Sequence, residues 1–145
     1  MDTEHYRKLE RMYLGAPLNQ HIYTTTTASI GEGTAEIGLT VEPKYHHGLG
    51  AMHGSVYFKL LDDACFFSVA SLVKDVFVLT TTFQIHFLRP VPSGKIKAVG
   101  KVRFASRELW KAEATLYNEQ GKEVGFGSGD FVRSRAALTP EIGYQ

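Results

Sequence analysis

Residues 50–73 read GAMHGSVYFKLLDDACFFSVASLV, and this stretch decides the fold. From Val56 onward it contains neither Gly nor Pro, and its apolar side chains recur at intervals of three and four residues. That spacing is typical of an α-helix. Since apolar residues occupy most of its circumference, the helix has to be covered on nearly all sides. We therefore predict a long, mostly buried helix over residues 55–73.

The segments around this helix predict strands and one further helix. After it the apolar period changes to two, which predicts strands at residues 76–88, 96–104, 109–117 and 123–132. Before it, two runs rich in β-branched residues, 21–30 and 34–43, flank a Gly-Glu-Gly and predict a hairpin. Residues 3–14 have helical spacing, with Thr3 as the expected N-cap and Gly15 as the stop.

This order of elements indicates the α+β class. It contains no strand–helix–strand alternation of the kind that predicts a parallel sheet. We expect an antiparallel sheet of about six strands wrapped around one long central helix, with a short N-terminal helix. Glycines at positions 125, 127 and 129 of the last strand predict the close approach of another backbone. No linker or repeat divides the chain, so we expect one domain over residues 1–145, with its core at about 20–135.

The composition excludes some classes of partner. Sixteen basic and fifteen acidic residues leave a formal net charge of +1, without the basic stripe typical of proteins that bind duplex nucleic acid. A ligand with a few phosphates needs only a local group of cations, so CoA remains possible. Cys65 is the single cysteine and cannot form an internal disulfide. The charged N-terminal segment lacks a signal core, and no apolar run reaches the ~18 residues of a membrane span. We expect a soluble, cytoplasmic protein without a membrane partner.

The first candidate site is the junction of residues 50–55, which leads into the long helix. The first N–H groups of a helix have no intrahelical partner. Together with the helix dipole they stabilise a carbonyl oxygen that gains negative charge. Gly54 lets a substrate approach this backbone without a Cβ in the way. The alternative is ordinary capping of the helix by Ser55.

The second candidate site is the pair Asp62 and Asp63 in the middle of the helix. A carboxylate is rarely buried without a partner, so one on a core helix requires an explanation. Successive helical residues point about 100° apart, so the two aspartates cannot serve one small site equally. Lys59 lies within helical reach of either. The spacing alone leaves both a functional and a structural role open for Asp62.

The remaining reactive side chains do not form a recognised pattern. His46, His47 and His53 read HHxxxxxH, which matches no zinc-ligand spacing and lacks a fourth partner, so we expect no metal. Cys65 lies between apolar neighbours and is interpreted as a core residue. The chain has no G-x-S-x-G elbow, P-loop or dinucleotide fingerprint.

Together these features resemble the hotdog-fold thioesterase superfamily, in its phenylacetyl-CoA-type (PaaI-like) branch. The pattern of that family is Asn-x-x-Gly-x-x-His-Gly-Gly, followed by an acidic residue on the central helix. Residues 47–55 read HGLGAMHGS, and Asp62 occupies the acidic position. The resemblance covers residues 45–133 and includes FLRP at 87–90. Two residues depart from the pattern, since His47 replaces the Asn and Ser55 replaces the second Gly.

The resemblance implies a hotdog fold, hydrolysis of acyl-CoA thioesters, and a site shared between two subunits of a homodimer or a dimer of dimers. It implies Asp62 as general base or nucleophile, the Gly54 N–H as the group that polarises the thioester carbonyl, and Thr80 as a hydroxyl that assists the attacking water. A thioester is already electrophilic, so these groups and a water suffice without a cofactor. The resemblance also implies a positioning role for His47, and binding of substrate or CoA by His53, Ser55, Arg89, Ser106 and Arg107.

Two alternatives accompany this hypothesis. A hotdog hydratase or dehydratase acting on acyl thioesters would pair His53 with Asp62 for proton transfer at adjacent carbons. A non-catalytic acyl-CoA-binding protein would bind the same ligand without turnover.

Strand alternation conflicts with the role of Thr80. Along residues 76–88 it puts Thr80 on the polar side, with Thr82, Gln84 and His86, opposite the apolar face. A β-bulge between these residues would return Thr80 to the apolar side.

Overall fold

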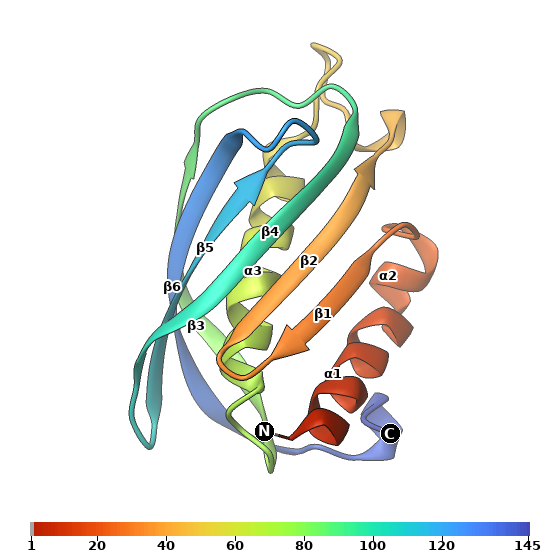
Figure 1. Ribbon diagram of the computed structural model, residues 1–145. Coiled ribbons are helices and arrows are strands. Elements are labelled where there is room, and N and C mark those ends of the chain that lie inside the picture. Colours follow the sequence, from red (N-terminus) through yellow and green to blue (C-terminus); the bar gives the residue numbers. More distant parts are fainter. Residues whose placement is uncertain (1) are drawn as a thin grey trace.

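The elements follow one another in the predicted order, with three short additions (Figure 1). The computed structural model describes residues 2–145. The helices are α1 (Thr3–Gly15), α2 (Pro17–His21) and α3 (Gly54–Ala70). Two 3-10 turns are η1 (Pro43–Tyr45) and η2 (Pro140–Ile142). The strands are β1 (Thr27–Gly31), β2 (Thr34–Val41), β3 (Val76–Phe87), β4 (Gly94–Ala105), β5 (Leu109–Tyr117) and β6 (Glu123–Ala137). Over residues 2–145 no helix is both long and apolar enough to cross a membrane.

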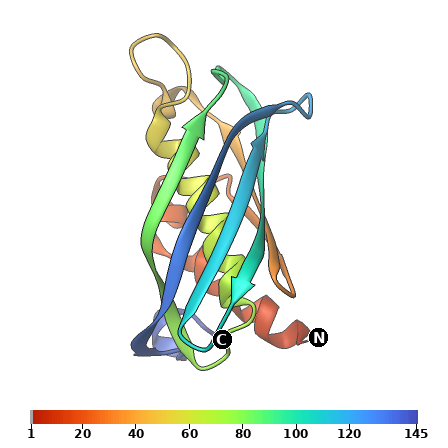
Figure 2. The same cartoon turned by 90° about the vertical axis from the view of Figure 1, so that its left-hand side faces the viewer.

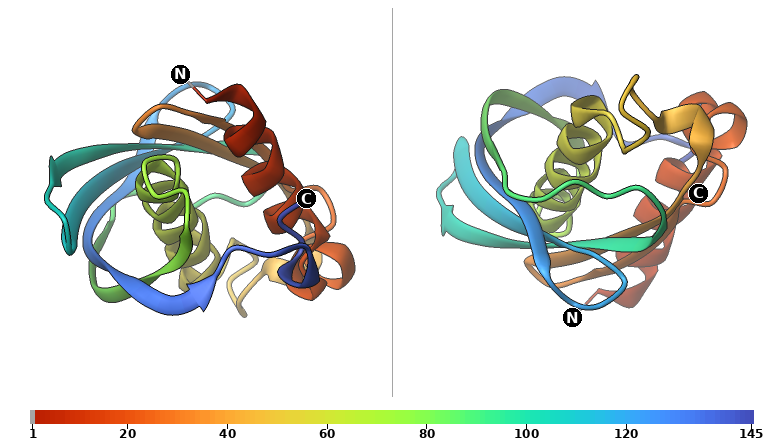
Figure 3. Two further views of the ribbon diagram at one scale, coloured as in Figure 1. Left: turned by 90° about the horizontal axis from the view of Figure 1, so that it is seen from below. Right: turned by 90° about the horizontal axis from the view of Figure 1, so that it is seen from above.

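All six strands join one antiparallel sheet, in the order β1-β2-β4-β5-β6-β3. The sheet curves around α3, which runs along its inner face (Figure 2). Seen from either end, β3 and β6 wrap to one side of α3 while α1 lies on the other (Figure 3). The predicted architecture, an antiparallel sheet around a central helix with a short N-terminal helix, is confirmed. Its two edges are β1 and β3.

The central helix lies directly on the sheet. Ten of its seventeen residues are buried, and Leu60, Leu61 and Ala64 are completely covered. Gly100 on β4 faces the helix where an added Cβ would lie 2.4 Å from the Ala64 carbonyl oxygen. Any larger residue would collide with helix backbone, so this close packing requires glycine at position 100.

The glycines of β6 were expected to admit another backbone on one face, but the backbone near them is that of the paired strand β3. Added Cβ atoms at Gly127 and Gly129 would each lie 2.8 Å from a carbonyl oxygen of β3, and closer still to the Phe83 ring. Because β3 pairs with β6 in the same sheet, these carbonyl oxygens belong to the neighbouring strand and not to a second layer. The glycines therefore leave room for the Phe83 ring, which also packs against Phe58 of α3.

Two expectations for the N-terminal part are wrong. Residues 21–26 do not form a strand: α2 and a turn occupy this region, and β1 begins at Thr27. Pro17 starts α2, since proline suits the first turn of a helix. Asp2, not Thr3, caps α1, because the Asp2 side chain accepts a hydrogen bond from the His5 N–H at 3.1 Å.

The C-terminal ends of α3 and β6 also differ from those predicted. The helix α3 ends at Ala70 instead of residue 73, and β6 continues five residues past the predicted strand end at 132, to Ala137. At the end of α3 the buried His5 ring contacts the Ala70 carbonyl oxygen at 2.9 Å through Nε2 and the Tyr144 hydroxyl at 2.7 Å through Nδ1. These contacts tie α1, α3 and the C-terminal segment together.

Candidate active site

A carboxylate on the central helix contacts a hydroxyl on the edge strand. Thr80 Oγ1 donates a hydrogen bond to Asp62 Oδ1 at 2.9 Å. Burial raises the pKa of Asp62 from its ordinary value of 3.8 to about 6, against the lowering effect of this hydrogen bond. A carboxyl group that titrates near neutral pH is suited to general acid–base chemistry.

A β-bulge in β3 brings Thr80 to this position. Between Thr80 and Thr82 the strand gains one residue relative to β6. Thr80 and the fully buried Val78 therefore face α3 before the bulge, and Phe83 faces it afterwards. The prediction from simple alternation, which placed Thr80 opposite the apolar face, is wrong because the alternation is interrupted at Thr81.

Aromatic rings flank the Asp62 carboxylate on both sides along the helix. Phe58, one turn before it, packs edge-on against Phe83 with ring centres 5.2 Å apart. Phe66, one turn after it, packs against Phe77 at 5.1 Å. Each pair joins α3 to β3. Asp62 is partly buried between these two pairs along the helix, and burial is the physical cause of its raised pKa.

The neighbouring aspartate makes structural contacts through one of its carboxylate oxygens. Asp63 Oδ2 accepts a hydrogen bond from Lys59 Nζ at 2.8 Å and from the Tyr13 hydroxyl at 2.6 Å. Both aspartates lie within helical reach of Lys59, and Asp63 is the one that forms the ion pair. Asp62 remains without a salt bridge among the described residues.

The start of α3 presents a free backbone donor. His53 is the N-cap, and its Nδ1 accepts a hydrogen bond from the Ser55 N–H at 3.0 Å, so His53 and not Ser55 caps the helix. The Gly54 N–H has no hydrogen-bond partner within residues 2–145. An added Cβ at Gly54 would lie 3.2 Å from the Phe87 ring. The donor sits beside a pocket of about 310 Å³ that is lined by His47, Met52, Gly54, Tyr57, Phe87, Leu88, Arg89 and Pro90.

The free N–H and the carboxylate lie far apart within one chain. Gly54 and Asp62 are eight residues apart on α3, which at 1.5 Å per residue is about 12 Å along the helix axis. Gly54 is level with Phe87 on β3, whereas Asp62 is level with Thr80. A single thioester carbonyl cannot contact both groups of the same chain.

The sequence of this chain matches a known family of proteins. Residues 49–125, more than half of the chain, match the model of the thioesterase superfamily. The chain belongs to the thioesterase superfamily. A curated relative is the acyl-coenzyme A thioesterase PaaI of Escherichia coli (strain K12), 28% identical over 114 residues that cover 78% of this chain and 80% of that protein.

Solved thioesterase-superfamily structures share the fold. The Escherichia coli PaaI protein from the phenylacetic acid degradation operon superposes with a TM-score of 0.83 at 22% identity, covering 94% of this chain and 98% of that one. A mutant of the phenylacetic acid degradation protein PaaI from Thermus thermophilus gives 0.73 at 19% identity, covering 82% and 100%. The hotdog fold and the PaaI-like resemblance predicted from the sequence are confirmed.

The two histidines predicted to belong to the site lie at or near the start of α3. His47 lines the pocket and is exposed, and its Nδ1 accepts a hydrogen bond from the Leu49 N–H at 3.0 Å. His53 caps the helix nine residues before Asp62, about 13 Å along the axis. Within one chain His53 and Asp62 therefore cannot share a substrate carbon. No three metal-ligating side chains gather anywhere in the described part of the chain.

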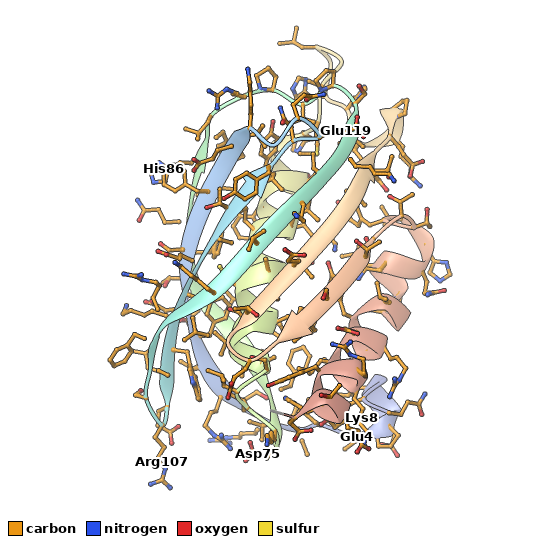
Figure 4. All side chains as sticks on the ribbon, viewed as in Figure 1. Glu4, Lys8, Asp75, His86, Arg107 and Glu119 are labelled. Atoms are coloured by element: carbon orange, nitrogen blue, oxygen red, sulfur yellow. The ribbon has the colours of Figure 1, made fainter. Side chains whose placement is uncertain are left out.

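The predicted CoA-binding residues lie at opposite ends of the molecule. Arg89 lines the pocket beside Gly54, and its guanidinium donates to the Glu123 carbonyl oxygen at 2.5 Å. Arg107 lies at the far tip of the β4–β5 hairpin with a 94% exposed side chain (Figure 4). Ser106 Oγ donates to the Leu109 carbonyl oxygen at 2.8 Å and so closes this hairpin. Since β4 has 12 residues, roughly 40 Å of strand separates the two ends.

Some residues around the carboxylate were not singled out from the sequence. Phe58 and Phe66 lie four residues before and after Asp62, so helical spacing could have identified them. Tyr13 could not be found in this way, because fifty residues separate it from Asp63 and only the folded chain joins them.

Proposed function

We propose that this protein hydrolyses acyl-CoA thioesters to the free acid and CoA, with Asp62 as general base or nucleophile. The observation that carries this proposal is the Asp62 carboxylate, which is partly buried, has a pKa raised to about 6 by burial and accepts the Thr80 hydrogen bond. The curated relative from Escherichia coli is named as an acyl-coenzyme A thioesterase, and this supports CoA esters as the substrate class.

Asp62 has the properties that the chemistry needs. At neutral pH a carboxyl group with a pKa near 6 is mostly ionised and still accepts a proton readily. Thr80 occupies Oδ1, which leaves Oδ2 for a water molecule. As the water oxygen bonds to the thioester carbon, its proton passes to Asp62; the C–S bond then breaks and the CoA sulfur takes up a proton. If Asp62 attacks instead, an acyl anhydride forms first and water hydrolyses it.

The Gly54 N–H is the proposed donor to the thioester oxygen. Gly54 is the first residue of a seventeen-residue helix, so the positive end of the helix dipole strengthens the attraction of this N–H for a negatively charged oxygen. The oxygen gains negative charge as the tetrahedral intermediate forms, and a fixed donor stabilises that charge without rearrangement. Gly54 and Phe87 line the same pocket, so an acyl thioester bound to the Gly54 N–H would lie next to an aromatic ring.

A homodimer would unite these two groups. Gly54 is level with Phe87 and Asp62 with Thr80, and β3 is an edge strand whose outer side is free to pair. If two β3 strands pair antiparallel about a point between Phe83 and Gln84, residue 87 of one chain lies opposite residue 80 of the other. Gly54 of one subunit is then level with Asp62 of its partner. Each dimer would hold two such sites, and dimers could pair further into tetramers.

The same arrangement bears on the CoA phosphates. Arg89 lies at the Gly54 end of a chain and Arg107 at the other end. In an antiparallel pair the far end of one subunit lies beside the near end of the other, so Arg89 and the partner subunit's Arg107 approach one site. We therefore assign CoA recognition to arginines from both subunits, with Ser106 shaping the hairpin that carries Arg107.

A panel of acyl-CoA esters tests the proposal, with free thiol measured after each incubation. We expect steady thiol release for at least one acyl group at neutral pH, without added metal. Loss of the enoyl-CoA absorbance without thiol release would show that the protein hydrates enoyl-CoA esters and does not hydrolyse them. Saturable acyl-CoA binding without either reaction would mean that the protein binds CoA esters and does not hydrolyse them.

A further inference from the structure

The ion pair next to Asp62 is buried more deeply than a pair on a helix surface. Lys59 Nζ and Asp63 Oδ2 are 2.8 Å apart, with side chains only 11% and 21% exposed. An exposed ion pair at this spacing contributes little to the stability of a protein, since water screens the two charges. Each charge of a pair that is shielded from water acts more strongly on its neighbours than an exposed charge does. Asp62, the residue on which the proposed hydrolysis depends, directly precedes Asp63 in the sequence.

The N-terminal part of the chain holds this pair in place. The Tyr13 hydroxyl on α1 donates to Asp63 at 2.6 Å and accepts from Lys59 at 3.0 Å. The ammonium group also lies 4.9 Å from the Tyr13 ring centre and 4.8 Å from that of Tyr23. Tyr23 in turn stacks on Tyr45 at 5.1 Å. All three tyrosines precede residues 49–125, the segment that matches the superfamily.

Lys59 and Asp63 carry the two charges that act on Asp62, because the other groups around it are neutral. From β3 comes the uncharged Thr80 hydroxyl. Burial raises the pKa of Tyr13 on α1 and of Cys65 on α3 well above their usual values, so both stay neutral at physiological pH. Lys59 favours the ionised form of Asp62 and Asp63 favours the protonated form. While the pair is intact, the two effects oppose each other.

We propose that Lys59 and Asp63 are positioning residues whose opposed charges, held together by the Tyr13 hydroxyl, offset each other at Asp62, so that the loss of either charge changes the pH at which Asp62 loses its proton and hence the pH range of the reaction. This inference rests on the proposed hydrolytic role of Asp62. It gives the N-terminal helix, which supplies no reacting group, a part in tuning the site. It also explains why the aspartate that makes the contacts is not the one that reacts.

Breaking the pair from either side is expected to move the acid limb of the pH–rate profile in opposite directions. Lys59→Gln leaves the Asp63 charge unopposed, which favours protonated Asp62 and moves the limb to higher pH by roughly half a unit or more. Asp63→Asn leaves the Lys59 charge unopposed and moves the limb to lower pH by a similar amount. The double variant Lys59→Gln/Asp63→Asn should return towards the wild-type limb. Lys97→Gln, on the outer face of β4, is the control and should not move it.

A direct titration separates this inference from the proposed function. Carbon-13 NMR of labelled aspartate follows the Asp62 carboxyl in each variant, whether or not the protein turns over a thioester. Tyr13→Phe keeps both charges and removes only the two hydroxyl contacts, so it should lower the Tm while moving the Asp62 titration less than either charge change. Titration midpoints that shift in the same direction in both single variants, or in neither, would overturn the tuning role. Opposite shifts without any thiol release would retain it and reject the hydrolysis.

Discussion

Thr80 and Asp62 meet across the fold, the hydroxyl donating to the carboxylate at 2.9 Å although eighteen residues separate them in the chain. The contact exists because β3 gains a residue after Thr80, which leaves this hydroxyl on the helix side of the strand. The carboxylate is thus held by an edge strand that would itself form the subunit interface in the proposed dimer.

Removing this hydroxyl should raise the pKa of Asp62. Burial already raises it to about 6, and the Thr80 hydrogen bond to the ionised form lowers it. In Thr80→Val the lowering contribution is gone, so less of Asp62 is ionised at a given pH. The acid limb of the pH–rate profile should move to higher pH, whereas Thr80→Ser should keep it in place. An unchanged limb in Thr80→Val would show that the hydrogen bond has no part in the titration.

Replacing Asp62 separates it from its neighbour. Asp62→Asn keeps the shape and removes the base, so turnover should fall by about two to four orders of magnitude. Asp63→Asn should be milder, because Asp63 contacts Lys59 and Tyr13 and not the proposed water. A larger loss in Asp63→Asn would mean that the other aspartate reacts.

The same Asp62→Asn variant should be more stable than the wild type at pH 7. The folded-state pKa of Asp62 lies above its ordinary value of 3.8, so its ionisation opposes folding increasingly as the pH rises from 3.8 to 6 and beyond. Well below pH 3.8 the group is protonated in both states and the effect vanishes, so thermal unfolding of both proteins at pH 7 and about pH 3 measures this difference. A lower Tm for the variant at pH 7 would contradict it.

Gly54 allows its N–H to be removed without breaking the helix. It is the first residue of α3, where proline is tolerated, and His53 before it has φ −65° and ψ 146°, which suit a residue that precedes proline. Gly54→Pro should lower kcat about a hundredfold to a thousandfold, as expected for a lost oxyanion donor. Gly54→Ala adds the same Cβ next to Phe87 and keeps the N–H, so it measures the steric part alone. Equal losses in the two variants would remove the donor role.

Mixing two inactive variants tests whether the site is shared. Asp62→Asn and Gly54→Pro damage opposite halves of the proposed composite site, so a heterodimer retains one intact site. Random mixing should restore about a quarter of wild-type activity, and light scattering should show a dimer or tetramer. A fully active monomer at micromolar concentration, or mixed dimers without any recovery, would place all reacting groups within one chain.

The arginines should affect binding more than chemistry. Arg89→Ala and Arg107→Ala should each raise KM for acyl-CoA more than for a short thioester that lacks the nucleotide, with kcat nearly unchanged, because a distant phosphate contact is the same in ground and transition states. Lys97→Ala is a matched surface control. Equal changes of KM for both substrates would contradict a contact between either arginine and a CoA phosphate.

The fold was predictable because the apolar side chains of its helices and strands recur at regular intervals in the sequence. The apolar helix at residues 55–73 and the alternating strands after it were found from side-chain spacing alone, with ends displaced by a few residues. The start of β1 was not predicted correctly, because β-branched composition suggested a strand from residue 21, whereas the end of α2 and a turn occupy residues 21–26. Short helices that depend on tertiary packing leave little trace in such a sequence.

The site was predictable only where its residues are close in the chain. Asp62 and Gly54 stand on one helix in a pattern that the family resemblance could align. Whether Asp62 or Asp63 would pair with Lys59 depended on Tyr13, fifty residues away. The inward orientation of Thr80 depended on one inserted residue in β3, and alternation cannot predict where a bulge falls.

The contact between Gly100 and the Ala64 carbonyl has a consequence for sequence variation. A single methyl group at position 100 would meet helix backbone at 2.4 Å, and the helix would have to rise off the sheet to accommodate it. Because α3 moves as a rod, Asp62, two residues before Ala64, would move with it and away from Thr80. In a screen of random variants position 100 should therefore behave like an active-site residue, intolerant of every substitution, although sheet and helix separate it from any ligand.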